Sequence, residues 1–400
     1  MPKAQIGLPG AIAIGLASML GAGLFVVFRN VAVAAGSLQS WSLLLAGTVA
    51  ILNSASIYQL AKNQSRAGGV YAYSRIYLSD TVSFIAGFSF VFGKIGSIAA
   101  IALVVEEYVA PGSGRIAAVF AIVVLMTINL FGINRTTLVA AVLASVTTLF
   151  IIFTILISAS SASSAAQSVT SLPAGNILQG ASLMFFAFAG YARVATLGTE
   201  VKSPTKTIPM AIAISLGVVL VLYISLAVIF THVLGPALVD SIAPFITLLS
   251  ITAPWFPTGI IIAIAVAAGL GSMLALLAGV SRTAAVMAED GEIPGVFKLL
   301  NRWGTPWVSE IAIAVGAILL VNLESISWVI AFSSFSVLLY YAIGHLSSIR
   351  QTLTERLMPR WLNYLGLALC LTLVLSVPGP AIPVSIGLLV AAVAVRKLSR

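Results

Sequence analysis

The chain has 400 residues, of which 60% are hydrophobic and only 8% are charged. These proportions exclude an ordinary soluble protein, because too little charge is available to cover a water-facing surface. The net charge of +9 could suggest a nucleic-acid partner, but the Lys and Arg residues gather in alternate short loops between apolar runs. That pattern is typical of a chain embedded in a lipid bilayer, and no nucleic-acid partner is expected.

Apolar runs follow one another along nearly the whole chain. A helix that crosses the hydrocarbon core of a bilayer needs about 20 mostly apolar residues. Residues 242–256 are expected to form a short re-entrant or extracellular helix, and Cys370, the lone cysteine, cannot form an intrachain disulfide. We predict twelve spans, at residues 9–34, 40–61, 81–105, 116–132, 138–160, 177–199, 208–232, 258–284, 309–323, 326–346, 361–377 and 380–395.

The distribution of basic residues predicts the orientation of these spans. With the N-terminus inside, most Lys and Arg residues fall in cytoplasmic segments. Arg115 and Arg29 fall in segments assigned to the other side, while Lys94 and Arg193 lie within spans. The positive-inside rule therefore predicts a multi-pass protein of the plasma or inner membrane with both termini in the cytoplasm.

Two of the predicted spans are interrupted by glycine. The first is broken at residues 20–24 and the sixth around residues 187–191, five spans later. Because five is an odd number, two successive five-helix units would have opposite topology in the membrane. Glycine-broken helices at matching positions of two halves point to the substrate site of a transporter. The alternative is that these glycines only allow helices to pack closely.

Four motifs resemble those of the amino acid-polyamine-organocation superfamily, and especially its cationic amino acid transporter-like branch. The resemblance covers nearly the whole chain. It implies an all-α membrane protein with a LeuT-like fold: two inverted five-helix repeats, at 1–160 and 161–346, and two additional helices at 347–400. The four motifs lie at residues 19–25, at 66–73, at 185–204 followed by 208–209, and at 281–282 leading to 289–294.

The resemblance implies a secondary transporter, a permease that moves amino acids by alternating access, and not an enzyme. A membrane sensor of amino acids or amines and a polyamine carrier are the alternatives. No cofactor is expected, and the glycine-rich pieces lack the Gly-Lys-Ser/Thr ending of a phosphate-binding loop, so ATP-driven transport is not indicated. The oligomeric state is left open.

The break in the first span predicts a site for a carboxylate. A half-helix that begins near Gly21, Ala22 and Gly23 presents free backbone N–H groups and the positive end of the helix dipole. Related carriers often have serine where this chain has Ala22, so backbone groups alone are expected to bind the carboxylate.

The resemblance also implies a site for the substrate's ammonium group. The backbone carbonyls of Met19, Phe186 and Ala189 would receive it beside Gly190, and the Phe186 ring would fold over the bound molecule as a gate. A packed core position is the alternative for Phe186. Because the site is mostly apolar, a neutral amino acid is favoured.

Lys94 lies near the middle of the third span, and an ionisable group at that depth is by default a functional candidate. Some proton-coupled relatives carry a lysine on the fifth span, where this chain has Thr147. Either Lys94 binds the coupling proton, or Thr147 and Ser272 bind sodium through their hydroxyl groups; the proton is favoured. Uncoupled exchange and a structural, paired or snorkelling Lys94 are the alternatives.

Three charged residues are expected near the cytoplasmic ends of the spans. Arg193 is expected to pair with a protein carboxylate, because a permanent charge in the membrane is usually neutralised internally. Glu200 and Arg282 would form an ion pair that closes an inner gate, with a static surface pair as the alternative.

The two histidines show no spacing typical of metal ligands. His232 and His345 lie near span ends and are expected at the membrane interface. No metal site is predicted.

Overall fold

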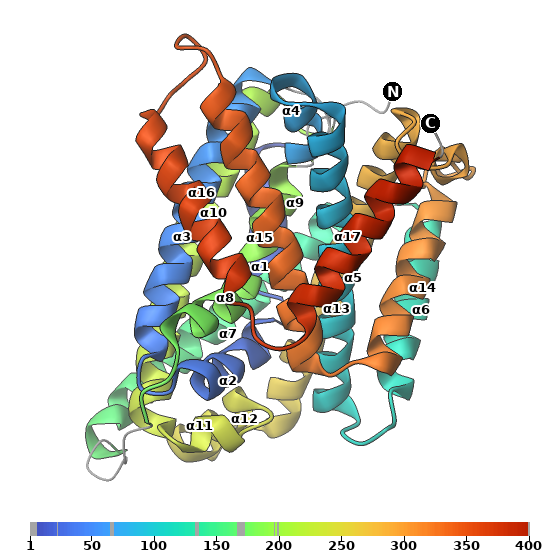
Figure 1. The fold of residues 1–400 in the computed structure, drawn as a ribbon. Helices are drawn as coiled ribbons and strands as arrows, with labels where there is room; N and C mark the ends of the chain where they lie inside the picture. The colour runs from blue at the N-terminus through green and yellow to red at the C-terminus, as the bar shows by residue number, and fades with distance from the viewer. Residues whose placement is uncertain are drawn as a thin grey trace.

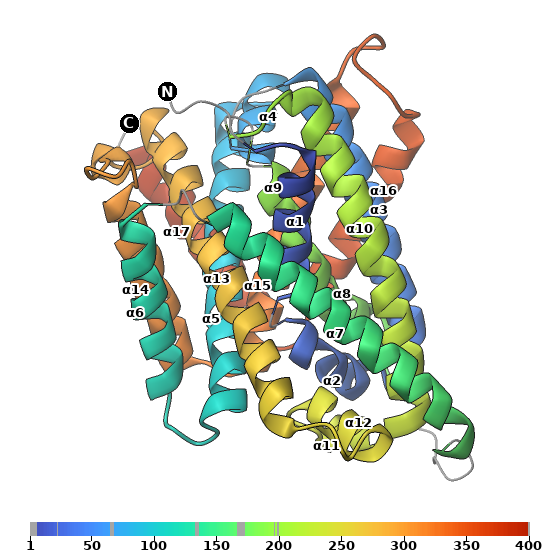
Figure 2. The same cartoon turned by 180° about the vertical axis from the view of Figure 1, so that it is seen from behind.

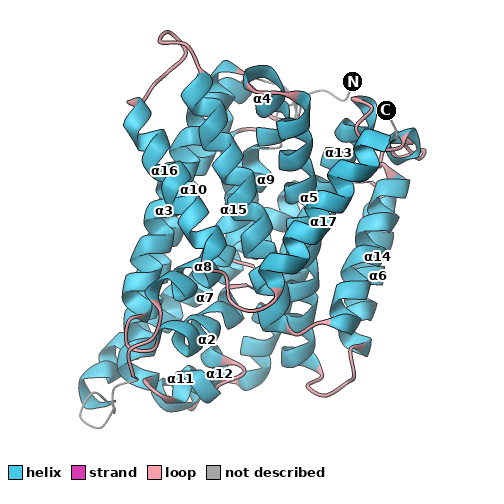
Figure 3. Cartoon of the chain, viewed as in Figure 1, coloured by secondary structure: helices cyan, strands magenta, loops and turns pink. Residues whose placement is uncertain are grey.

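The computed structural model describes residues 6–21, 23–64, 68–132, 136–165, 173–195, 197 and 200–398. Within these ranges the secondary structure is helical, apart from isolated β-bridges (Figure 3). The helices stand side by side in a bundle (Figures 1 and 2). The fold class predicted from the sequence, an all-α membrane protein, is therefore confirmed.

The first half of the bundle begins with two short helices in place of one continuous span. Its helices are α1 (Leu8–Met19), α2 (Leu24–Ala35), α3 (Gln39–Asn63), α4 (Val70–Tyr77), α5 (Asp80–Val109), α6 (Ile116–Leu130) and α7 (Thr136–Ala165).

The second half begins with α8 (Ile177–Phe188), a 3-10 turn η1 (Ala189–Tyr191) and α9 (Ala192–Ala195). It continues with α10 (Pro204–Ile229), a π-helical turn η2 (Phe230–Leu234), α11 (Ala237–Asp240), α12 (Pro244–Thr252), α13 (Thr258–Glu289), the 3-10 turn η3 (Gly295–Lys298), α14 (Trp307–Leu323) and α15 (Ile326–Arg350). Two helices follow, α16 (Arg360–Leu375) and α17 (Ala381–Leu398).

Every predicted span overlaps a helix, but the count of twelve stays a prediction. In the described part of the chain, eight helical segments are long and apolar enough to cross a membrane, and the bent pair α1 and α2 makes a ninth. Helices α6, α14 and α16 are apolar but have only 15, 17 and 16 residues. The division into two inverted repeats likewise stays a prediction.

Helices α5 and α15 form the centre of the bundle. In the most apolar window of each, 83% of the α5 residues and 78% of the α15 residues are buried, against 17% for α17 at the periphery. Glycine allows the close approach: a Cβ atom on Gly93 would lie 2.8 Å from the Ser336 Cβ, and one on Gly96 would lie 2.9 Å from the Phe332 ring. The α5 segment that carries Lys94 is thus held firmly against α15.

Both termini lie at one end of the bundle, called here the terminal end; α11 and α12 lie at the opposite, far end (Figures 1 and 2). The short helix expected within 242–256 is therefore found as α12, on the surface of the far end.

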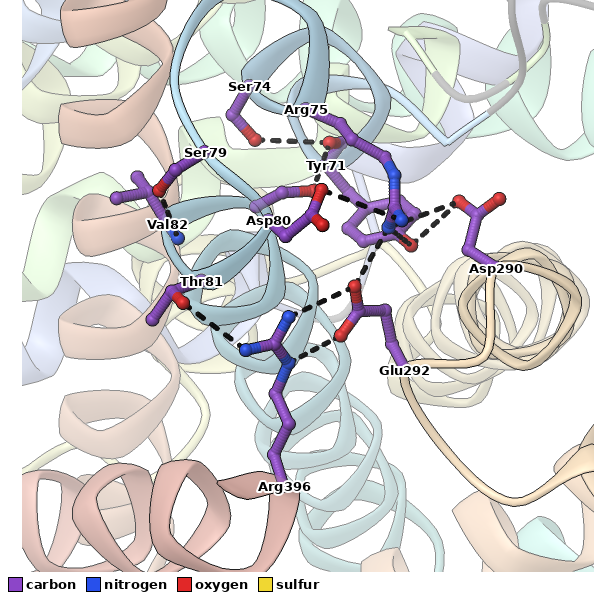
Figure 4. Close-up of polar contacts among 11 residues, drawn as sticks. Tyr71, Ser74, Arg75, Ser79, Asp80, Thr81, Val82, Asp290, Glu292 and Arg396 are labelled. Atoms are coloured by element: carbon purple, nitrogen blue, oxygen red, sulfur yellow. Dashed lines mark hydrogen bonds and ion pairs between the residues drawn. The ribbon is translucent and has the colours of Figure 1, made fainter. Parts of the chain in front are cut away.

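A network of charges joins three parts of the terminal end (Figure 4). The Glu292 carboxylate, in the loop after α13, is fully buried and accepts hydrogen bonds from Arg75 of α4 (2.8 Å) and from Arg396 of α17. Arg75 also pairs with Asp80 (3.5 Å), and the Tyr71 hydroxyl donates to Asp290 (2.8 Å). Burial and the bond to Asp290 raise the pKa of Tyr71, so its hydroxyl stays a donor.

Replacing Glu292 is expected to weaken this end of the molecule. Glu292→Gln keeps the shape but removes the negative charge shared by two arginines, and losing one partner of a buried pair costs about 3–5 kcal/mol. Thermal unfolding in detergent would measure the loss. Glu289→Gln, at an exposed position three residues earlier, is the control and should change the stability by less than about 0.5 kcal/mol. Equal stability of the two variants would contradict the expectation.

Candidate functional site

The first predicted break separates α1 from α2. Helix α1 ends at Met19, α2 begins at Leu24, and their axes differ by 46°. Gly23 precedes α2 and has no side chain to cap its first amides. Gly21 lies against α13, because a Cβ there would be 2.4 Å from the Ser272 Cβ. Ala22, the remaining residue of the predicted carboxylate site, lies outside the described residues.

The second break is milder than the sequence suggested. After Phe188 the backbone tightens into the 3-10 turn η1 and continues as α9, so the helical path is not interrupted between Ile177 and Ala195. The turn still lies directly against the first break. A Cβ on Gly190 would be 2.4 Å from the Ser18 carbonyl carbon and 2.6 Å from the Met19 nitrogen. The 3-10 turn of the sixth span and the break of the first span therefore meet backbone to backbone.

A small cavity lies where the two breaks meet. Its volume is about 20 Å³, room for about one water molecule and not for an amino acid. Seven residues proposed from the sequence line it: Met19, Gly21, Gly23, Lys94, Phe186, Gly190 and Ser272. The others are Ser18, Ser97, Ile101, Ala187 and Leu276, whereas neither Ala189 nor Thr147 is among the lining residues.

Phe186 accounts for much of the lack of space. A Cβ on Gly23 would meet the Phe186 ring at 2.7 Å, so the ring lies directly over the start of α2. A molecule could contact the α2 amides only after this ring had turned away. The geometry fits the gate predicted for Phe186.

Lys94 crosses the cavity to the second break. Its Nζ donates a hydrogen bond to the Ala189 carbonyl oxygen at 2.9 Å, and the residue is 2% exposed. Among the described residues that line the cavity, Lys94 is the one with a charged side chain.

A second backbone carbonyl at the breaks also has a protein donor. The Tyr223 hydroxyl of α10 donates to the Met19 oxygen at 2.6 Å and lies 3.4 Å from the Ala187 oxygen. The assignment of the Met19 and Ala189 carbonyls to a substrate ammonium stays a prediction. At Ala189 such a group would compete with Lys94.

Two serine hydroxyls of the cavity lack a hydrogen-bond partner among the described residues. The Ser272 and Ser18 Oγ atoms are buried and unpaired, whereas Ser97 Oγ pairs with Ser333 at 2.7 Å. Sequence reasoning missed Ser18, although it directly precedes the motif at the first break. Unpaired buried hydroxyls are suited to a polar ligand, because leaving them unpaired is unfavourable.

Three charged side chains gather on the terminal side of the breaks. Glu200 forms an ion pair with Arg282, as predicted, and lies 3.9 Å from Arg193. Burial alone would raise the pKa of Glu200, but the charges of Arg193 and Arg282 outweigh it and hold that pKa below the usual range. Ile6 adds backbone hydrogen bonds with Glu200 (3.1 Å) and Lys202 (2.9 Å), which tie the start of α1 to the segment after α9.

Aromatic rings pack against one another on the far side of the first break. The ring centroid of Phe25, two residues after Gly23, lies 4.8 Å from that of Phe245 on α12 and 5.9 Å from that of Tyr108 on α5. Phe150 of α7 stacks on Phe25 at 6.4 Å. These rings form one aromatic cluster that joins α2, α5, α7 and α12.

Two buried polar groups show the limits of sequence reasoning. His345, expected at the interface, is instead 1% exposed, and its ring nitrogens lie 2.8 Å from Asn53 and 3.2 Å from Asn363. That expectation was wrong, because nearness to a span end does not reveal polar partners on neighbouring helices. Glu310, which sequence reasoning overlooked, is buried at the start of α14 and accepts a bond from Asn129 (2.9 Å).

The contact between the breaks predicts the effect of adding one methyl group. Gly190→Ala would force the Ser18–Met19 backbone away, and overpacking of this kind costs about 1–3 kcal/mol. Gly217→Ala is a matched control within α10, where no atom lies within 4 Å of the added Cβ. Thermal unfolding of both variants checks the prediction, which fails if Gly190→Ala is as stable as Gly217→Ala.

The Glu200–Arg282 pair is expected to stabilise the structure modestly. The two side chains are 20% and 35% exposed, so we expect a coupling free energy of about 1 kcal/mol from a double-mutant cycle of Glu200→Gln and Arg282→Gln. Because the pKa of Glu200 is lowered, this contribution should be complete at neutral pH and fade as the pH falls through that lowered value. A coupling energy of zero at pH 7 would show that the pair contributes nothing.

Comparison with known proteins finds permeases and transporters. A family model described as "Amino acid permease" matches residues 10–397. An uncharacterized transporter of Mycobacterium tuberculosis is 37% identical, over 99% of this chain and 92% of its own. The vacuolar cationic amino acid transporter 4 of Arabidopsis thaliana is 25% identical, over 76% of this chain and 56% of its own.

Among solved structures, a sodium-coupled sialic acid symporter in a substrate-bound outward-open state has a similar fold. The TM-score is 0.62 at 14% identity, with 94% of this chain and 89% of the symporter covered. The fold of the chain is thus LeuT-like, as the motifs implied.

Proposed function

Because the chain belongs to the amino acid permease family, we propose that this membrane transporter carries an amino acid by alternating access. The observation that carries the proposal is the direct contact of the broken first span with the 3-10 turn of the sixth span, beside a small cavity. Breaks in membrane helices expose backbone groups suited to the carboxylate and ammonium groups of a zwitterion. The protein is a transporter and not an enzyme.

The amides at the start of α2 are the proposed carboxylate site, with the unpaired hydroxyls of Ser18 and Ser272 as additional donors. Phe186 is the proposed gate over the bound molecule, since its ring already covers Gly23. Separation of Glu200 from Arg282 would open the terminal side of the cavity.

We propose a neutral amino acid as the substrate. A cationic side chain would need a carboxylate partner, and the described lining residues include one lysine and no acidic residue. This favours a neutral substrate here, although a relative is named a cationic amino acid transporter.

We place the protein in the plasma or inner membrane, with its terminal end facing the cytoplasm. Support comes from the concentration of Lys and Arg in the loops of that side.

Lys94 is the proposed binding site of a coupling proton. Sodium has less support, because Ser272 lines the cavity but Thr147 does not.

Ser272 offers a test that separates binding from stability. Because its hydroxyl has no protein partner among the described residues, Ser272→Ala should leave the unliganded protein as stable as before. It should weaken binding of a neutral amino acid such as L-leucine about tenfold, the loss of one hydrogen bond.

The measurement is the ligand-induced rise in melting temperature, followed by uptake of labelled amino acids into proteoliposomes. Ser225→Ala, on the exposed face of α10, is the matched control. If no amino acid stabilises the wild-type protein or is taken up, the proposed function is wrong. If Ser272→Ala binds like the wild type, the assigned role of Ser272 is wrong.

A further inference from the structure

The contact between Lys94 and Ala189 places an ammonium group of the protein where an ammonium group of a substrate is expected. Ala189 directly follows α8 and begins the 3-10 turn η1, where the hydrogen bonding of the helix changes. Its carbonyl oxygen is a backbone acceptor, and such an acceptor suits an ammonium group. Lys94 Nζ uses this acceptor at 2.9 Å.

Lys94 is held in place by its surroundings. Gly93 and Gly96 allow its helix to pack closely against α15, and Lys94 itself is 2% exposed. The Lys94 ammonium group is therefore part of the cavity wall, and it binds the Ala189 carbonyl from a helix that is itself held in place.

Two ammonium groups bound at the same carbonyl oxygen would repel each other. A carbonyl oxygen has two lone pairs and could accept two donors. However, two positive charges about 4 Å apart at the dielectric of a protein interior would weaken binding by roughly a thousandfold. The repulsion disappears if Lys94 is neutral, because burial disfavours the charged form of an amine.

The other ionisable groups around Lys94 are engaged elsewhere or are phenols. On α9, Arg193 pairs with Glu200, and on α14, Glu310 binds Asn129. On α5 itself, Glu106 is twelve positions away and accepts a bond from the Arg115 amide, about 18 Å along the helix.

The remaining neighbours are uncharged. The phenols of the adjacent elements are Tyr191 on η1, Tyr223 on α10, and Tyr340 and Tyr341 on α15, and a phenol is neutral near pH 7. From α1 and α13 the cavity receives only Ser18, Ser272 and apolar or glycine residues. Among the described residues that line the cavity, Lys94 is thus the one whose side chain can carry a positive charge and lose it with a proton.

We propose that Lys94 is an internal competitor of the substrate ammonium, so that an amino acid binds at Ala189 only when Lys94 gives up its proton. This inference rests on the proposed function. The substrate keeps its own ammonium proton, and the proton of Lys94 Nζ passes to the aqueous phase from which the substrate enters. When the substrate leaves, Lys94 takes up a proton and returns to the carbonyl. Substrate and proton therefore cross the membrane in opposite directions, and a proton gradient directed inward would drive export of the amino acid.

Calorimetric titration of the purified wild-type protein with L-leucine and L-alanine, in buffers of different ionisation enthalpy, tests the inference. We expect about one proton to be released per amino acid bound wherever Lys94 is charged. In that range the affinity should rise about tenfold per pH unit, because proton release and binding are linked. 4-Methylpentanoate, which is leucine without its ammonium group, should release no proton if it binds.

Three variants sharpen the test. Lys94→Met should bind L-leucine with an affinity that does not depend on pH and with no proton release. Lys94→Arg, whose charge is permanent, should bind at least a hundredfold more weakly at every pH. Lys62→Met, at an exposed position on α3, is the matched control and should behave like the wild type.

The outcomes separate this inference from the proposed function. If L-leucine binds to the wild-type protein with no proton release, or with proton uptake, the competition is refuted while amino acid transport stands. If neither amino acid binds and none is taken up, the proposed function is refuted and the inference with it. The wild-type titration decides the matter even if a Lys94 variant fails to fold.

Discussion

Backbone groups freed by a break in a membrane helix must find new partners, because lipid offers none. This constraint governs the centre of the molecule. The Met19 carbonyl is satisfied by the Tyr223 hydroxyl and the Ala189 carbonyl by the Lys94 ammonium. Each donor comes from a helix outside the broken spans, so the breaks are stabilised by the surrounding scaffold and not by their own segments.

Glycine makes the same region compact. Gly190 allows the two breaks to touch, Gly21 admits Ser272, and Gly23 lies beneath the Phe186 ring. The result is a cavity too small for an amino acid. Binding of an amino acid there would require these closely packed groups to move apart.

The charges of the molecule fall into two classes with different consequences. At the terminal end, Glu292 and Glu200 each lie between two arginines, and these ion pairs hold segments of the chain together. Lys94 has a backbone carbonyl as its hydrogen-bond partner and no carboxylate among the lining residues. Lys94 thus differs from the arginines of the terminal end, whose hydrogen-bond partners are carboxylates.

The sequence by itself determined the fold class, the approximate position of every described helix of more than ten residues, the break at Gly21–Gly23 and most residues of the cavity, since these follow from local hydropathy, glycine placement and motifs. It did not indicate that Tyr223 and Lys94 would satisfy the freed carbonyls, that the second break would be only a 3-10 turn, or that His345 and Glu310 would be buried. Those outcomes depend on which side chains of different helices come into contact. Some of these contacts join residues more than a hundred positions apart in the sequence, as for Tyr223 and Met19. Hydropathy is a property of each segment alone, whereas such partnerships are decided only when the helices pack.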